Sequence, residues 1–261
     1  MTNRLSKLAG WVLHDSWPPL PCPECGEGVI RPDGPLTTIR DPASEKLLAR
    51  VNSGLDGPGE LTGTCSGVFQ CSDPGCARRV LISGDWSHDI DEHPHTYATR
   101  WADYIRVRYI APAIPIITTP AKTPDKARAA INAASELLWL NPNAAANHLR
   151  QAIEELLNSK GVKRSEITKQ KKRRQLSTHQ RIELYRTTSP ANVPIADTLE
   201  AVKWIGNSGS HQATLTITDV LEGAELLESA LKELYDTTAS ARRARVKQIN
   251  KGRGLPRAKT T

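Results

Sequence analysis

The chain has 261 residues, enough for two modest domains, and 38% of them are hydrophobic. Its formal net charge is +7, but residues 237–261 contain eight Lys or Arg and no acid, so the remainder carries −1. No apolar run approaches the about 20 residues of a membrane-spanning helix, and the N-terminal apolar stretch is too short for a secretion signal. We therefore expect a cytoplasmic protein without membrane contact.

Residues 1–112 favour strands and loops. Pro- and Gly-rich turn signals such as WPPLPCPECG, RPDGP and GLDGPGE divide this region into short segments. These segments predict a β-rich module of the zinc-ribbon type, with strands expected at 28–31, 61–71, 78–83 and 104–110.

Four of the five cysteines form two pairs. Cys22 and Cys25 lie in PCPECGEG, where a tight turn aims two thiolates at one ion and a small Gly lets backbone amides approach the sulfurs. Cys71 and Cys76 lie in QCSDPGC, where a Pro-Gly turn brings the sulfurs together. Two such knuckles predict a structural Zn²⁺ held by four thiolates in a reducing compartment.

Two other features near these pairs can be explained without a metal ion. Cys65 lies about 20 Å from Cys71 along an extended strand, so we expect a small buried hydrophobic residue there rather than a fifth ligand. The stretch DWSHDIDEHPHTY, residues 85–97, has three His and four acids. Its spacing matches no metal site, and we interpret it as a polar loop, with a second metal as the alternative.

From residue 113 the pattern changes. Residues 113–122 are interrupted by prolines and predict an extended linker, whose isoleucines should lie against a surface. Residues 123–240 predict an all-α antiparallel bundle, so the fold class is α+β. The first two helices have Thr123 and Asn141 as N-caps and prolines at their first positions. Further helices are expected over 177–188, from about 194 and from about 218.

The segment of residues 160–174 joins the second and third helices and holds eight basic residues against one acid. We interpret it as a polar connector. Residues 241–261 form a basic tail that includes Arg242, Arg243, Arg245 and Lys247. Such a tail either contacts nucleic acid or an acidic partner, or is a solvated chain end.

The stretch KWIGNSGSH, residues 203–211, is unusual because it places two glycines and two serines in a helical pattern. If the helix continues, Lys203, Asn207 and His211 fall at i, i+4 and i+8 and form one stripe. The small residues between them would allow a neighbouring helix or a second subunit to come close. The alternative is a helix that ends at Gly206, followed by a loop.

The Asn-x-x-x-His spacing of Asn207 and His211, late in a helical bundle, resembles the HEPN superfamily. The pair formed by NHLRQAIEELLNSKGV, residues 147–162, and KWIGNSGSH is similar to a prokaryotic branch with a GNxxxH signature, found in restriction and other defence-associated proteins. The resemblance covers about residues 110–235. It implies a homodimer formed through the bundle, and Arg150 and Glu154 facing the GNxxxH segment.

HEPN ribonucleases resemble one another in carrying an Arg-polar-x-x-x-His motif, with which they cleave RNA without a metal ion. This chain has Gly206 where that Arg would stand, so Lys203 or Arg150 would have to stabilise phosphate charge. The favoured hypothesis is therefore a zinc-containing binding or adaptor protein, associated with RNA or DNA or with a protein of a defence system. The alternatives are a ribonuclease or toxin that uses His211, Asn207 and Arg150, and a structural dimerisation module.

Overall fold

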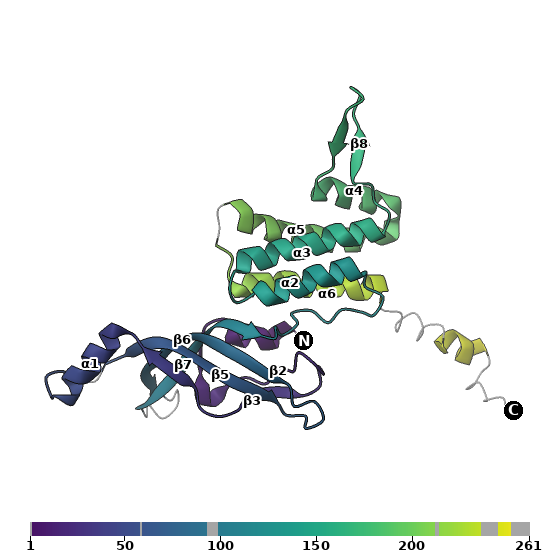
Figure 1. Cartoon of the computed structure of the whole chain (residues 1–261). Coiled ribbons are helices and arrows are strands. Elements are labelled where there is room, and N and C mark those ends of the chain that lie inside the picture. The colour runs from purple at the N-terminus through teal and green to yellow at the C-terminus, as the bar shows by residue number, and fades with distance from the viewer. Residues whose placement is uncertain (1, 58, 93–98, 212–213, 236–244, 252–261) are drawn as a thin grey trace.

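The computed structural model describes residues 2–57, 59–92, 99–211, 214–235 and 245–251, with side chains for all of these except 2, 3, 92 and 208–211. An antiparallel sheet forms the N-terminal part, and a largely helical region follows it (Figure 1). This is the α+β arrangement that the sequence predicts. Within the described residues, no helix has both the length and the apolar character needed to span a lipid bilayer.

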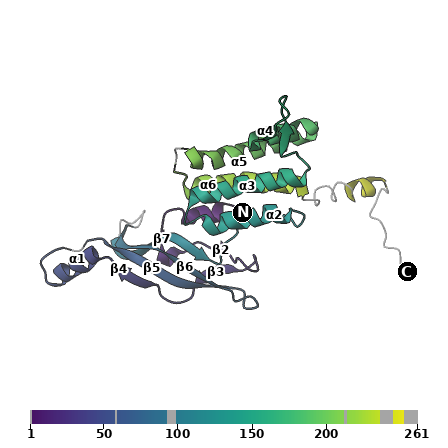
Figure 2. The ribbon, with the colours of Figure 1, turned by 45° about the horizontal axis from the view of Figure 1, so that its top comes forward.

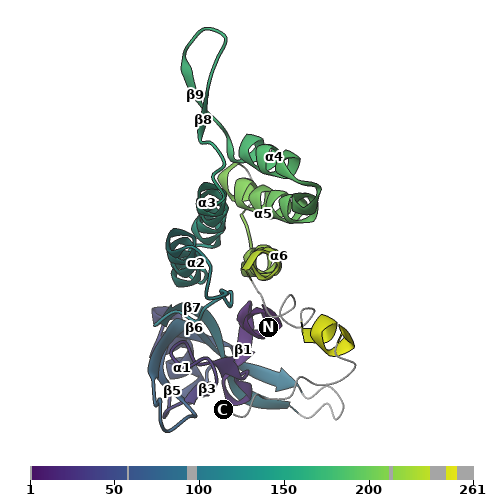
Figure 3. The same ribbon diagram turned by 90° about the vertical axis from the view of Figure 1, so that its right-hand side faces the viewer.

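Seven strands form the N-terminal sheet, which curves into a half-barrel (Figure 3). Their order is β1-β7-β6-β5-β3-β2, and β4 also pairs with β5. Cys65, Phe69 and Cys71 of β5 are buried and face the interior, and the residues between them are half-buried or exposed. The strands are β1 (Trp11–Leu13), β2 (Leu20–Pro21), β3 (Val29–Pro32), β4 (Thr37–Arg40), β5 (Leu61–Cys71), β6 (Arg79–Glu92) and β7 (Thr99–Ala111).

Strands β6 and β7 are longer than predicted. Residues 85–92, expected to be a polar loop, continue β6 and pair with β7. Their polar side chains find partners across the two strands: His88 Nδ1 lies 2.9 Å from Asp103 Oδ1, and Tyr104 donates to Asp91 at 3.0 Å. A strand can therefore be polar here because its neighbour supplies the matching groups.

Helix α1 (Pro42–Asn52) was not predicted. Its start nonetheless carries two helix signals, Asp41 at the N-cap position and Pro42 at the first helical position. It ends before Gly54, whose φ of +69° is a conformation that favours glycine. These signals lie among the turn residues of the β-rich part, which obscured them.

The extended linker between the two parts lies against the helices, as its isoleucines indicate. Ile114, Ile116 and Ile117 are all buried, and the backbone N–H of Ile116 donates to Ser135 Oγ at 3.2 Å. Arg128 donates to Thr119 Oγ1 at 2.9 Å and to the carbonyls of Pro120, Ala121 and Thr123.

Within the described residues, the five α-helices α2 to α6 follow the linker, and residues 245–251 form a further helical segment. Asn141 caps α3 by accepting from the N–H of Ala144 at 3.0 Å, as predicted, and Ser177 caps α4 with a capping box. Thr123 does not cap α2, because that helix begins at Asp125 with Pro124 in the cap position. The helices are α2 (Asp125–Leu137), α3 (Pro142–Ser159), α4 (Thr178–Thr188), α5 (Val193–His211) and α6 (Ile217–Tyr235), and a 3-10 turn, η3 (Pro190–Asn192), precedes α5.

Residues 160–174 are not a plain connector. They include most of a two-stranded antiparallel hairpin, which consists of β8 (Ser165–Ile167) and β9 (Arg173–Gln175). The turn is closed by the N–H of Lys171, which donates to the Thr168 carbonyl at 2.8 Å. Lys171 has a φ of +59°, and a residue in this left-handed region at the end of a turn is typical of hairpins.

The N-terminal 3-10 helix η1 (Thr2–Leu8) joins the two parts by packing on α6. Figure 2 shows the resulting layers, with α4 and α5 outermost, α3 and α6 next, and α2 and η1 nearest the sheet. The 3-10 turn η2 (His14–Ser16) follows β1. Leu5 and Leu8 of η1 are buried in the same hydrophobic core as the strands and helices.

Candidate functional site

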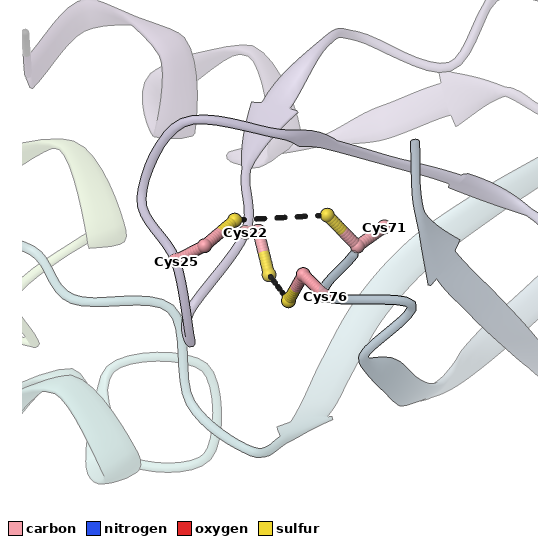
Figure 4. A group of neighbouring side chains, drawn as sticks. All are labelled: Cys22, Cys25, Cys71 and Cys76. Carbon is pink, nitrogen blue, oxygen red and sulfur yellow. Dashed lines mark hydrogen bonds between the residues drawn. The ribbon is translucent and has the colours of Figure 1, made fainter. Parts of the chain in front are cut away.

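Cys22, Cys25, Cys71 and Cys76 converge at one end of the sheet (Figure 4). Cys22 and Cys25 lie in the turn between β2 and β3, and the other pair lies where β5 turns into β6. The two turns are neighbours because β3 pairs with β5, with Ile30 opposite Cys71. This strand pairing brings together two cysteine pairs that are separated by 45 residues in the sequence.

The sulfur positions fit a tetrahedral metal ion. Cys22 Sγ lies 3.8 Å from Cys76 Sγ, and Cys25 Sγ lies 3.7 Å from Cys71 Sγ. All four sulfurs lie within 4.8 Å of one another. A tetrahedron with Zn–S bonds of about 2.3 Å has edges of about 3.8 Å, whereas a disulfide requires about 2.05 Å. The geometry therefore fits Zn²⁺ and excludes disulfides.

Backbone amides surround the sulfurs. The N–H of Glu24 donates to Cys22 Sγ at 3.4 Å, that of Gly28 to Cys25 Sγ at 3.3 Å, and that of Asp73 to Cys71 Sγ at 3.4 Å. Such bonds favour the thiolate over the thiol. The sequence predicts this role for the turn backbone in general, but it does not single out these donors.

The electrostatics of the cluster also favour a cation. Backbone N–H groups, chiefly that of Gly28, lower the pKa of Cys25 to about 7, whereas burial raises the pKa of Cys71 to about 12. Four sulfurs so close together cannot all be thiolates without a positive charge between them. A bound Zn²⁺ would supply that charge, and four thiolates would fill its coordination sphere, which is typical of a structural site.

Cys65 does not join this cluster. It is buried, its sulfur points at the carbonyl of Asp85 at 3.8 Å, and burial raises the pKa of its thiol to about 11. The expected role as a small buried hydrophobic residue agrees with this position.

A second group of predicted residues lines a cleft between α3, α4 and α5. The cleft has a volume of about 440 Å³ and is lined by Arg150, Glu154, Lys203 and Asn207 together with the start of α4, residues 176–179. The sequence places Lys203 and Asn207 on one helical stripe, but it relates them to Arg150 and Glu154 of α3 only through a family resemblance. The sequence does not indicate that the start of α4 lines this cleft.

Arg150 is held in place within the cleft. Its Nη1 lies 2.7 Å from Glu154 Oε1 and donates to Thr178 Oγ1 at 3.2 Å, while Nε and Nη2 both contact Asn147 Oδ1. Thr178 donates in turn to Glu154 Oε1 at 2.7 Å. Glu154 therefore neutralises Arg150 and leaves little of its charge for a ligand.

Lys203 differs from Arg150 because it is 4% exposed and forms no ion pair with any described residue. Its Nζ lies 3.0 Å from the centre of the Trp204 ring. Burial lowers the pKa of Lys203, and the carboxylate of Glu200 opposes that effect only in part. A buried ammonium without an anion is costly, so this position favours an anionic ligand.

Gly206 permits the close approach of α5 to α3. A Cβ at this position would lie 3.1 Å from the Ala146 carbonyl oxygen and 3.1 Å from Arg150 Cβ. A larger side chain at this position would therefore require α3 and α5 to move apart. The helix does not end at Gly206, since α5 continues to His211.

Several predicted residues cannot be placed in a site. The side chain of His211 lies outside the described residues, as do Arg242 and Arg243. Arg245 and Lys247 are exposed in a helical segment over residues 245–251. In the proposed second metal loop, His93 and His95 lie outside the described residues, while His88 pairs with Asp103.

One further cluster of possible metal ligands was missed by the sequence analysis. His179, Glu183 and Glu200 approach one another on α4 and α5. Arg186 occupies this cluster, with Nε 3.0 Å from Glu183 Oε1 and Nη2 2.7 Å from Glu200 Oε2. The carboxylates are therefore already neutralised, which disfavours a metal ion there.

Fold and site define a protein with a four-cysteine cluster that could hold a metal ion in a β module, followed by a largely helical region. Residues 132–252, which begin within α2, match the family model described as a domain of unknown function, DUF4145. Comparison with curated proteins and with solved structures finds no match. The matched segment lies in the helical region that follows the cysteine-bearing module.

Proposed function

We propose that this protein is a zinc-containing binding or adaptor protein whose HEPN-like helical region holds a phosphate group of a nucleic acid. The observation that carries the proposal is Lys203, a buried ammonium that lines the cleft between α3, α4 and α5 without an ion pair among the described residues. A phosphate oxygen would supply the missing partner through a charge-assisted hydrogen bond.

The surroundings of Lys203 support a phosphate ligand. The hydroxyl of Ser177 and the amide of Asn207 line the same cleft and can donate to phosphate oxygens. The cleft contains one carboxylate, that of Glu154, and Arg150 neutralises it. Among the described residues that line the cleft, Lys203 therefore carries a charge that no ion pair neutralises.

Binding of a short 5′-phosphorylated single-stranded RNA, followed by fluorescence anisotropy, tests the proposal. The variant Lys203→Gln should bind about tenfold more weakly, because one charge-assisted contact is lost. Its folded state should be no less stable than the wild type, since a buried cation without a partner stabilises little. Lys126→Gln, which removes an exposed lysine on α2, is the matched control and should leave binding unchanged.

Two results would contradict this function. Absence of RNA binding by the wild type at low salt would exclude it. Equal affinity of the wild type and Lys203→Gln would exclude the cleft as the binding site.

A metal-independent ribonuclease is a second candidate function. The supporting observation is that α5 is continuous to His211, which places Asn207 and His211 one helical turn apart next to the cleft. RNA cleavage that resists a chelator and is lost in His211→Ala would favour this candidate over the binding protein.

The proposal includes a homodimer formed through the helical region, with a nucleic acid or a defence-system protein as partner. Trp204 is 55% exposed and Val193 is 39% exposed on α5, which lies in the outermost layer of helices. Aromatic residues that remain exposed are enriched in protein interfaces. Light scattering of the purified protein should give the mass of a dimer.

A further inference from the structure

The hairpin formed by β8 and β9, together with the five residues that lead into it, residues 160–164, has a strong excess of positive charge. Eight basic residues and one acid lie between residues 160 and 174, and all eight basic residues are exposed. They are Lys160, Lys163, Arg164, Lys169, Lys171, Lys172, Arg173 and Arg174.

Few of these charges are neutralised within the chain. Arg174 pairs with Glu166 at 2.5 Å, and Arg164 lies 4.0 Å from Glu155. Lys160 lies over the Tyr235 ring. The other five form no ion pair with any residue that the structure describes, and three of them, Lys169, Lys171 and Lys172, lie at or next to the turn.

The base of the hairpin is fixed to the helices by Arg181. This arginine of α4 is 5% exposed and donates to the carbonyls of Val162 at 3.1 Å and Lys163 at 3.3 Å. It also donates to Asn158 Oδ1 at 2.7 Å. The N–H of Leu176 closes the base by donating to the Arg164 carbonyl at 2.9 Å.

Beyond this base the hairpin projects away from the helices, as Figures 1 and 3 show. Ile167 of β8 is 77% exposed, so the projecting part also presents an apolar side chain. A rigid base and a projecting, unneutralised tip are features of an arm that contacts a partner rather than of a packed element.

We propose that the β8–β9 hairpin is an arm that enters the major groove of duplex DNA. The major groove of B-form DNA is about 12 Å wide and admits a two-stranded ribbon, and the phosphates on both of its edges match the lysines at the turn. Ile167 then meets the apolar edge of a base pair, where thymine presents its methyl group.

The arm would be a second binding surface beside the cleft of Lys203. The inference depends on the proposed function only in taking the partner to be a nucleic acid. Leu176 and Ser177 line the cleft of Lys203 and directly follow β9, so one bound nucleic acid can contact both surfaces. The two surfaces carry separate lysines, and substitutions can therefore distinguish them.

The test measures binding of the full chain to a labelled duplex DNA of two helical turns over a series of salt concentrations. The triple variant Lys169→Gln, Lys171→Gln, Lys172→Gln should bind more than about tenfold more weakly at low salt. Its slope of log affinity against log salt should be shallower by about 2.7, since each phosphate contact contributes about 0.9. The charge-preserving triple Lys→Arg variant should retain the affinity.

The matched control removes three exposed lysines elsewhere, through Lys46→Gln, Lys122→Gln and Lys126→Gln. It should bind the duplex like the wild type. A duplex RNA of the same sequence should bind more weakly, because the major groove of an A-form helix is too narrow for the ribbon.

Each opposite result overturns the inference. Failure of the wild type to bind duplex DNA excludes the arm. So does an equal loss of affinity in the hairpin Lys→Gln triple variant and in the control triple variant. Equal affinity for the DNA and RNA duplexes excludes insertion into the groove. An unchanged hairpin triple variant together with a weakened Lys203→Gln variant would reject the arm and leave the proposed function intact.

Discussion

Gly28 is the residue on which the geometry of the cysteine cluster depends most directly. A Cβ at this position would lie 2.3 Å from Cys71 Sγ and 3.2 Å from Asp73 Cβ. Glycine is therefore required here for space between the two turns. Its backbone N–H also donates to Cys25 Sγ, so any shift of the chain would weaken a bond to a ligand as well.

We predict that Gly28→Ala lowers the zinc content of the purified protein. The added methyl group must displace Cys71 Sγ or separate β3 from β5, and either change opens the tetrahedron. Zinc bound per chain, measured with a chromophoric chelator after denaturation, should fall well below that of the wild type.

Gly10→Ala provides the control for this substitution. A Cβ at Gly10 would meet nothing within 4 Å, so the zinc content should equal that of the wild type. If Gly28→Ala bound zinc as fully as the control, the sulfur positions would not represent the metal-bound state.

The attachment of the β8–β9 hairpin shows how one element depends on another. Arg181 of α4 is buried, and its guanidinium donates to two carbonyls at the base of the hairpin and to the side chain of Asn158 on α3. Burial lowers the pKa of Arg181, but an arginine remains charged in proteins. Its hydrogen bonds replace the water that this charge loses.

We predict that Arg181→Gln destabilises the protein by about 3 kcal/mol, because the carbonyls of Val162 and Lys163 lose a charged donor. Thermal denaturation should show the loss of stability. Hydrogen exchange should be faster in the hairpin than in the wild type, with the N–H of Leu176 among those affected.

Arg173→Gln is the matched control for Arg181→Gln. It removes an exposed arginine of the hairpin, whose hydrogen bond to Ser165 Oγ spans 2.9 Å and contributes little to stability. Equal exchange rates in both variants would mean that Arg181 does not hold the hairpin.

Sequence patterns revealed the elements that bury a regular apolar face and missed those that do not. The helices α2 to α6 carry apolar residues at helical spacing, and caps such as Asn141 mark their starts. The hairpin and the second half of β6 consist mainly of charged and polar residues, which are stabilised by partners on neighbouring strands. A single sequence does not show which segments become neighbours.

The two sites differ in the same way. The cysteine spacing contains enough chemistry to predict one metal site without knowledge of the fold. The cleft depends on Thr178 and the start of α4, which approach Arg150 and Lys203 only after three helices have packed. Its shape therefore follows from tertiary structure, and only the helix stripe of Lys203 and Asn207 was visible in the sequence.

On the scale of the whole molecule, the β module and the helices share one core. Leu8 of η1 is 1% exposed, and its helix packs on α6 while β1 continues directly into the sheet. The linker is buried on α2 through Ile114 and Ile116. Neither part can therefore unfold without exposing apolar surface of the other.

We predict that the metal site and the helices are lost in one cooperative thermal transition. Zinc release, followed with a chelating dye, and helix content, followed by circular dichroism, should have the same midpoint, because coincident probes indicate a two-state process. Excess chelator should shift the helix transition to lower temperature, since a metal that binds only the folded state stabilises it. Leu8→Ala should cost about 2 to 5 kcal/mol and lower both midpoints together, since it opens the contact between the two parts. Zinc release well before helix loss in the wild type would show instead that the two parts unfold independently and that η1 does not couple them.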